Sequence, residues 1–174
     1  CQFWSQVNKK YATKVSPFKA KDLNLFIKIV EPLFTLPLLV LNLLPHRIIE
    51  GYRKHMQAFF QAILETSGRK VVVDSSKSTW TNIGRPIAMK KICGFDLKLI
   101  HLVRDGRGII YSRLKGKNML LEKGIKTNKK NQVGAFYAAI SWLITNITSL
   151  FVEYFYFRGK VLRVNYEDLV LNYK

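Results

Sequence analysis

A short passage in the middle of the chain carries residue types that could hold a phosphate group. The apolar run Leu99 to Val103 stops at Arg104, and Gly108 and Ser112 follow at intervals of four residues. If the turn winds directly into a helix, these three residues form one stripe, with a notch at Gly108 between a guanidinium and a hydroxyl. Arginine donates paired hydrogen bonds to phosphate oxygens, and a helix N-terminus adds amide donors. The spacing therefore predicts a phosphate site.

From the residues alone, a second interpretation of this passage stays open. An Arg-Asp-Gly-Arg turn at residues 104–107 is often a solvated loop in which the aspartate, here Asp105, caps the next helix. The surrounding sequence has to decide between the two.

A second polar cluster, Asp74-Ser75-Ser76-Lys77, follows the β-branched run Val71 to Val73. A lysine there can stabilise charge on the oxygen of a leaving group, and the carboxylate can orient a substrate or accept a proton. The alternative is a turn in which Asp74 and the serines bond backbone amides.

The apolar periodicity changes several times along the chain, and this order predicts an α/β fold with a parallel sheet and flanking helices. The expected elements are a helix at 46–67, a strand at 70–74, a helix from about 82 to 92, a strand at 97–103, a helix at 135–156 and a strand at 160–165. Ligands of open parallel sheets bind at the carboxyl ends of the strands. We therefore expect residues 74–77, Arg104 and residues 165–167 along one edge.

Composition narrows the choice of partner. The chain has 174 residues and a formal net charge of +18, which suits one domain with an anionic partner such as a nucleotide, a nucleic acid, an acidic polysaccharide or a membrane surface. Its two cysteines argue against a disulfide framework or a cysteine-rich zinc site, and we predict no metal.

The most apolar segment, Pro32 to Pro45, contains three prolines and is shorter than a bilayer requires. We interpret it as a buried hydrophobic segment, so no membrane anchor is visible. The compartment stays open between the cytosol and, if the protein is eukaryotic and an anchor precedes Cys1, the Golgi lumen. The three histidines are better assigned to packing or surface roles than to catalysis.

Taken together, these passages resemble the sulfotransferases that use 3′-phosphoadenosine 5′-phosphosulfate (PAPS). The resemblance rests on Val-Val-Val-Asp74-Ser-Ser-Lys77, on Leu99 to Ser112 and on Val164-Asn-Tyr166-Glu-Asp168-Leu. Two weaker likenesses agree with it, namely Cys1-Gln-Phe-Trp4 and the pair Trp142 and Asn146.

The resemblance implies a fold like that of the P-loop nucleotide hydrolases, and a nucleotide site on matching residues. Arg104 and Ser112 would bind the 3′-phosphate beside Gly108, with Ser76 also on the nucleotide and Tyr166 toward the adenine. Lys77 would lie near the sulfuryl group, and Asp74 is a candidate base. Glu167 and Asp168 would hold that corner of the site through backbone and arginine contacts. The acceptor would be a hydroxyl or amine compound, with an acidic glycan suggested by the basic charge.

One feature of the family is missing from residues 1–70. Its early loop of the Arg-Ser-Gly-Thr type, whose amides wrap the 5′-phosphosulfate, has no counterpart there. We therefore expect a partial sulfotransferase domain, with residues 1–69 as a helical, substrate-side region and residues 70–174 as the nucleotide-binding portion. We expect little or no activity from residues 1–174 alone.

The rival function is a non-enzymatic module that binds polyanions or nucleic acid, supported by the charge and by scattered aromatic side chains. It predicts steep salt dependence and no preference for a 3′-phosphate, whereas the sulfotransferase interpretation predicts no specific nucleic acid partner. A P-loop kinase would need a Gly-x-x-x-x-Gly-Lys-Ser/Thr loop, which the sequence lacks.

Overall fold

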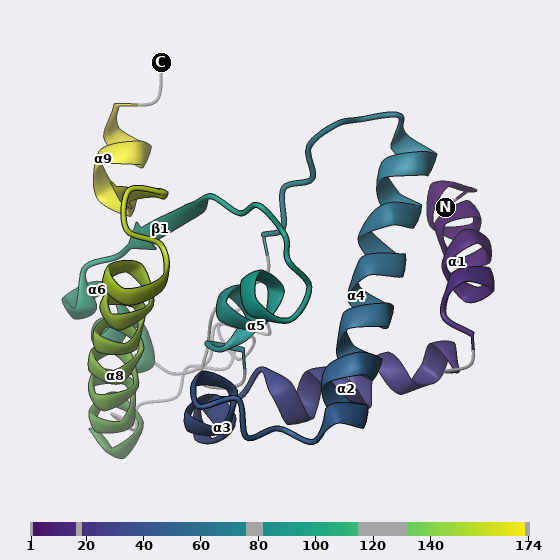
Figure 1. The fold of residues 1–174 in the computed structure, drawn as a ribbon. Helices are drawn as coiled ribbons and strands as arrows, with labels where there is room; N and C mark the ends of the chain where they lie inside the picture. The colour runs from purple at the N-terminus through teal and green to yellow at the C-terminus, as the bar shows by residue number, and fades with distance from the viewer. Residues whose placement is uncertain (1, 17–18, 76–81, 115–131, 173–174) are drawn as a thin grey trace. The chain divides into compact units, whose positions relative to one another are not determined.

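The computed structural model describes residues 2–16, 19–75, 82–114 and 132–172. The chain packs as two compact units, Cys1–Leu97 and Lys98–Lys174. The described part is a mixed α/β structure, mostly helical, with a two-stranded parallel sheet in the second unit (Figure 1). The functional division into residues 1–69 and 70–174 stays a prediction.

The first unit is built from helices. They are α1 (Gln2–Lys14), α2 (Leu23–Val30), α3 (Leu36–Val40), α4 (His46–Ser67) and α5 (Arg85–Lys91), with 3₁₀ turns at Ala20–Asp22 and Leu33–Thr35. The predicted helix at 46–67 is confirmed as α4. It ends at Gly68, whose left-handed backbone (φ 65°) lets its N–H bond the Leu64 carbonyl at 2.9 Å.

The core of this unit lies where α1 and α2 pack on α4 (Figure 1). The Tyr11 hydroxyl and His55 Nδ1 share a buried hydrogen bond of 2.6 Å. Burial raises the pKa of Tyr11 to about 12 and lowers that of His55. A Cβ at Gly51 would lie 2.3 Å from the Phe26 ring, so a larger residue at this position would force the ring of α2 to move off α4. His55 is therefore a packing residue, as predicted.

The predicted strand at residues 70–74 is wrong. Residues 71–75 form no regular secondary structure, and the side chains of Val71 and Val73 are 76% and 82% exposed. A β-branched run becomes a strand only where a neighbour supplies backbone hydrogen bonds, and among the described residues no strand pairs with it.

The apolar segment Pro32 to Pro45 is buried on one side only. Leu36, Leu39 and Leu44 lie in the core, whereas Phe34 is 78% exposed. The prediction of a buried segment therefore holds for four of its fourteen residues, whereas seven of them are exposed, because the segment coils into α3 and only one side of a surface helix meets the core.

The described residues of the second unit form a parallel pair of strands and three helices. The elements are β1 (Leu99–Val103), α6 (Gly106–Leu114), α8 (Gln132–Tyr156), β2 (Val161–Asn165) and α9 (Tyr166–Leu171). Leu99 pairs with Val161, and Val103 pairs with Asn165. The predicted strands at 97–103 and 160–165 and the helix at 135–156 are confirmed, with shifts of one to three residues at their ends.

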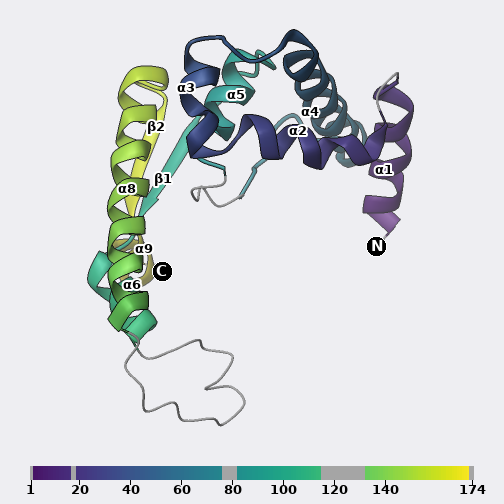
Figure 2. The ribbon, with the colours of Figure 1, turned by 90° about the horizontal axis from the view of Figure 1, so that it is seen from below.

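Helix α8 runs along this sheet and is tied to it by one carboxylate (Figure 2). Glu153 Oε1 contacts Nδ1 of His101 on β1, and its Oε2 accepts a hydrogen bond of 2.6 Å from Arg163 on β2. On the other face of the sheet, Ile100 and Leu162 are 68% and 61% exposed.

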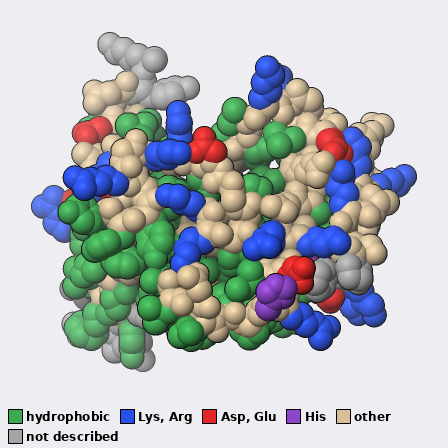
Figure 3. All heavy atoms as spheres, in the orientation of Figure 1, with side chains coloured by type: hydrophobic (Ala, Val, Ile, Leu, Met, Phe, Trp, Pro, Cys, Tyr) green, Lys and Arg blue, Asp and Glu red, His purple; other side chains and the backbone are tan. Residues whose placement is uncertain are grey.

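Hydrophobic side chains also gather on the surface over α8 (Figure 3). By length and composition, Gly134–Tyr156 is the one helix in the described residues that could cross a membrane, with the bent pair Leu23–Val30 and Leu33–Val40 as a second if it acts as one span. Core helices of soluble proteins reach the same length and apolar composition.

We expect Glu153→Gln to destabilise the second unit at neutral pH by about 1–2 kcal/mol, the scale of charge-assisted hydrogen bonds. Burial opposes ionisation of Glu153, but the bonds from Arg163 and His101 outweigh it and lower its pKa. The wild type should therefore lose this stabilisation as the pH falls below about 4.5 through the lower folded pKa, and the variant should not. Thermal melts between pH 7 and 3.5 measure the difference.

The matched control is Glu65→Gln, which removes an exposed carboxylate that pairs with Lys14 in the first unit. It should leave the melts unchanged. Equal acid sensitivity of wild type and Glu153→Gln would contradict the assignment.

Candidate anion-binding site

The candidate site lies at the carboxyl ends of β1 and β2. Arg104 follows β1 directly, and Tyr166 follows β2 directly. Because the strands are parallel and Val103 pairs with Asn165, both residues emerge at the same edge of the sheet. Two of the three polar clusters predicted to share an edge therefore do so.

The guanidinium of Arg104 is exposed and stacks on an aromatic ring. Its Cζ lies 5.1 Å from the centroid of the Tyr166 ring, and Tyr166 is itself 38% exposed. Stacking on one face leaves the N–H donors at the edge of the guanidinium directed outward, where they can reach an anion. A cation beside an aromatic ring suits a ligand that carries both a phosphate and a base.

Two other side chains hold the backbone that carries Arg104. Trp142 Nε1 on α8 donates to the Arg104 carbonyl at 2.9 Å, and Glu167 Oε1 on α9 accepts from the Asp105 N–H at 3.0 Å. Asp168 Oδ2 accepts a hydrogen bond of 3.0 Å from the side-chain Nδ2 of Asn165. The acidic residues Glu167 and Asp168 thus hold the segments that follow β1 and end β2, and Glu167 does so through a backbone contact of the kind that the resemblance implies.

The start of α6 is capped from within the chain. Asp105 Oδ1 accepts the Arg107 N–H at 2.9 Å, and the carboxylate also pairs with the Arg107 side chain. The hydrogen bonds from Arg107 lower the pKa of Asp105. The capping interpretation of this turn is therefore right, and it uses one of the amide donors. An anion here depends chiefly on the Arg104 side chain.

The expected stripe of Arg104, Gly108 and Ser112 is right in part. Helix α6 begins at Gly106, so Gly108 and Ser112 share a helical face but Arg104 precedes the helix. A Cβ at Gly108 would have no atom within 4 Å, so this position is open. The side chain of Ser112 is outside the described part of the structure.

The other predicted site residues belong to the first unit. Asp74 Oδ2 accepts a hydrogen bond of 3.0 Å from Arg85 Nε, and Arg85 Nη2 forms an ion pair with the same oxygen at 3.0 Å. Ser76 and Lys77 lie outside the described residues. The carboxylate of Asp74, the candidate base, is therefore paired with the guanidinium of Arg85.

Sequence reasoning missed the buried network behind Asp74. Arg85 Nη1 donates to Glu31 Oε1 at 2.8 Å, and the Tyr52 hydroxyl donates to the same oxygen at 2.9 Å. Glu31 is fully buried, and burial raises its pKa against the opposing effect of Arg85. The available signal was a lone acid within an apolar stretch, since glutamate is rarely buried without a partner.

A separate shallow groove of about 510 Å³ lies at the opposite end of β2. It is lined mainly by apolar side chains of the last turns of α8, and its charged lining residues are Glu153, Arg158 and Arg163. Arg158 Cζ lies 5.7 Å from the Tyr154 ring centroid, a stacking geometry close to that of Arg104 on Tyr166.

Within the residues described, no cluster of histidine, cysteine and acidic side chains could hold a metal ion. The comparisons identify no relative: no protein-family model, no curated protein and no solved structure matches the chain.

Proposed function

We propose that the protein is a sulfotransferase that binds PAPS and transfers its sulfuryl group to a hydroxyl or amine acceptor. The observation that carries the proposal is the exposed Arg104 guanidinium, stacked on Tyr166 at the carboxyl ends of two parallel strands and followed by a helix. Ligands of parallel sheets bind at this edge. A guanidinium fits the 3′-phosphate, and an aromatic ring beside it fits the adenine side of the nucleotide.

In the proposed reaction, the acceptor oxygen or nitrogen attacks sulfur, and the bond from sulfur to the 5′-phosphate oxygen breaks. The electron pair of that bond stays on the departing 3′,5′-ADP, and the acceptor proton passes to a base. Catalysis would come from positioning and from cationic stabilisation of the leaving group. Lys77 is assigned to the leaving oxygen and Asp74 to orientation or proton transfer. The P-loop-like fold and an acidic glycan as acceptor belong to the same proposal.

The second candidate is a non-enzymatic binder of polyanions. It is favoured by the formal net charge of +18 and by lysine and arginine side chains distributed over the visible face (Figure 3). Such a binder responds to total charge, so its affinity falls steeply with salt and ignores where a phosphate is attached.

Thermal stabilisation of the intact protein by 3′,5′-ADP and by 5′-ADP separates the two candidates, since these nucleotides differ by the 3′-phosphate. With ligand at about a hundred times its Kd, 3′,5′-ADP should raise the Tm by about 5–10 °C, because saturation at that level contributes about 2.7 kcal/mol. At the same concentration, 5′-ADP should raise it clearly less. Equal shifts that vanish at 0.5 M salt would favour the polyanion binder.

A further inference from the structure

We infer that Trp142 is a positioning residue for the 3′-phosphate site, which fixes the turn that carries Arg104 without touching the nucleotide. The inference rests on the proposed function. It assigns a role to a side chain that lies on a different element from either predicted phosphate ligand.

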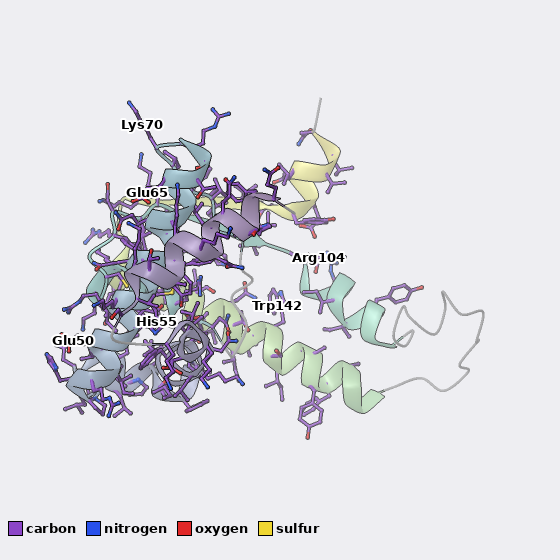
Figure 4. All side chains as sticks on the ribbon, turned by 90° about the vertical axis from the view of Figure 1, so that its right-hand side faces the viewer. Glu50, His55, Glu65, Lys70, Arg104 and Trp142 are labelled. Atoms are coloured by element: carbon purple, nitrogen blue, oxygen red, sulfur yellow. The ribbon has the colours of Figure 1, made fainter. Side chains whose placement is uncertain are left out.

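Trp142 contacts the turn in two ways, and both involve described atoms of the second unit. Its indole N–H donates to the Arg104 carbonyl at 2.9 Å. Its ring lies against Gly106, where a Cβ would stand 3.1 Å from the nearest ring atom, closer than most real contacts. In Figure 4, Trp142 lies on α8 and Arg104 lies shortly before the start of α6. The absence of a side chain at Gly106 thus allows the indole to reach the carbonyl.

The hydrogen bond of Trp142 is one of two that hold consecutive residues of the turn. From α9, Glu167 accepts the N–H of Asp105 at 3.0 Å. The peptide unit between Arg104 and Asp105 is therefore held at its carbonyl by α8 and at its N–H by α9. Because the peptide unit is planar, fixing its C=O and its N–H also fixes its orientation and restricts the backbone at the Cα of Arg104.

The fixed peptide plane limits the positions that the Arg104 guanidinium can reach. Arginine loses substantial side-chain entropy when it binds an anion, and a fixed starting point and the stack on Tyr166 reduce that loss. Trp142 should therefore contribute to affinity for the phosphate that Arg104 binds. Trp142 should contribute little to the affinity for a nucleotide that lacks this phosphate.

The test is Trp142→Phe, which keeps an aromatic ring against Gly106 but removes the N–H donor. Titration calorimetry on the intact protein should show about five- to tenfold weaker binding of 3′,5′-ADP, the scale of one lost hydrogen bond. Binding of 5′-ADP should be unchanged. The matched control is Thr148→Val, which removes a hydroxyl that donates to the Ile144 carbonyl within the same helix, and it should change neither affinity.

Several results would overturn the inference. Equal weakening of both nucleotides by Trp142→Phe indicates a general structural role, and no change in either indicates no role. If the wild type already binds 3′,5′-ADP and 5′-ADP equally, the proposed function fails and the inference fails with it. If the wild type prefers 3′,5′-ADP and Trp142→Phe keeps that preference, only the inference fails. If Trp142→Phe does not fold, Gly106→Ala replaces it. Its Cβ would stand 3.1 Å from the indole, so the ring has to shift by a few tenths of an ångström, which lengthens its hydrogen bond to the Arg104 carbonyl and should cause a smaller loss of the same selectivity.

Discussion

Replacement of Arg104 by alanine should weaken the binding of 3′,5′-ADP about a hundredfold. The guanidinium of Arg104 directly follows β1, as the sequence predicts, and lies exposed beside the Tyr166 ring. Losing two charge-assisted hydrogen bonds to a phosphate removes roughly 3 kcal/mol, which corresponds to about two orders of magnitude in Kd. Calorimetry on the intact protein gives the number, and the Tm without ligand should change little because this side chain is exposed.

The control for this experiment is Arg158→Ala. Arg158 is also exposed and also stacks on a tyrosine, but it lies at the opposite end of β2. Its loss removes the same charge and a similar stacking contact from the same unit. If both variants weaken binding equally, total charge decides affinity, and the specific role of Arg104 is refuted.

Replacement of Arg85 by methionine should destabilise the first unit by about 3–5 kcal/mol. Glu31 is fully buried and shares Arg85 with Asp74, so the variant leaves a buried carboxylate without its cation. The remaining donor is the Tyr52 hydroxyl. Urea unfolding followed by circular dichroism measures the loss.

The same variant should depend on pH in a defined direction. Burial already raises the pKa of Glu31, and removing Arg85 raises it further. A carboxyl group whose folded pKa is raised destabilises the protein as the pH increases above its unfolded value, so the deficit of Arg85→Met should grow from pH 5 to pH 8.

The double variant Arg85→Met with Glu31→Gln is the matched comparison, because it leaves no buried charge. It should be more stable than Arg85→Met alone at pH 8. A double variant that is less stable, or a deficit that shrinks with rising pH, would mean that the buried carboxylate is not the cause.

The sequence predicts those elements whose own pattern determines their structure. Helices α4 and α8 carry a helical apolar period over many turns, and β1 and β2 are short β-branched or aliphatic runs between glycines and charges. The run at residues 70–74 contains more β-branched residues than β1 but has no partner strand among the described residues. Strand formation depends on a neighbour elsewhere in the chain, and a local pattern carries no information about it.

The candidate site likewise contains residues that the local sequence pattern predicts and contacts that it does not predict. Arg104 and Tyr166 are recognisable because each follows a strand, and parallel pairing brings such positions together. The partnership of Arg85 with Glu31 joins residues 54 positions apart, and that of Trp142 with Arg104 joins residues 38 apart. Such contacts arise from the packing of elements, so residue types and spacing could not predict them.

The most direct test of the central claim is a crystal structure of the intact protein with 3′,5′-ADP bound. We expect the 3′-phosphate within hydrogen-bonding distance of the Arg104 guanidinium, beside Gly108, with the base on the side of Tyr166. A nucleotide whose 3′-phosphate binds elsewhere, while Arg104 stays stacked on Tyr166 and contacts no ligand, would contradict it.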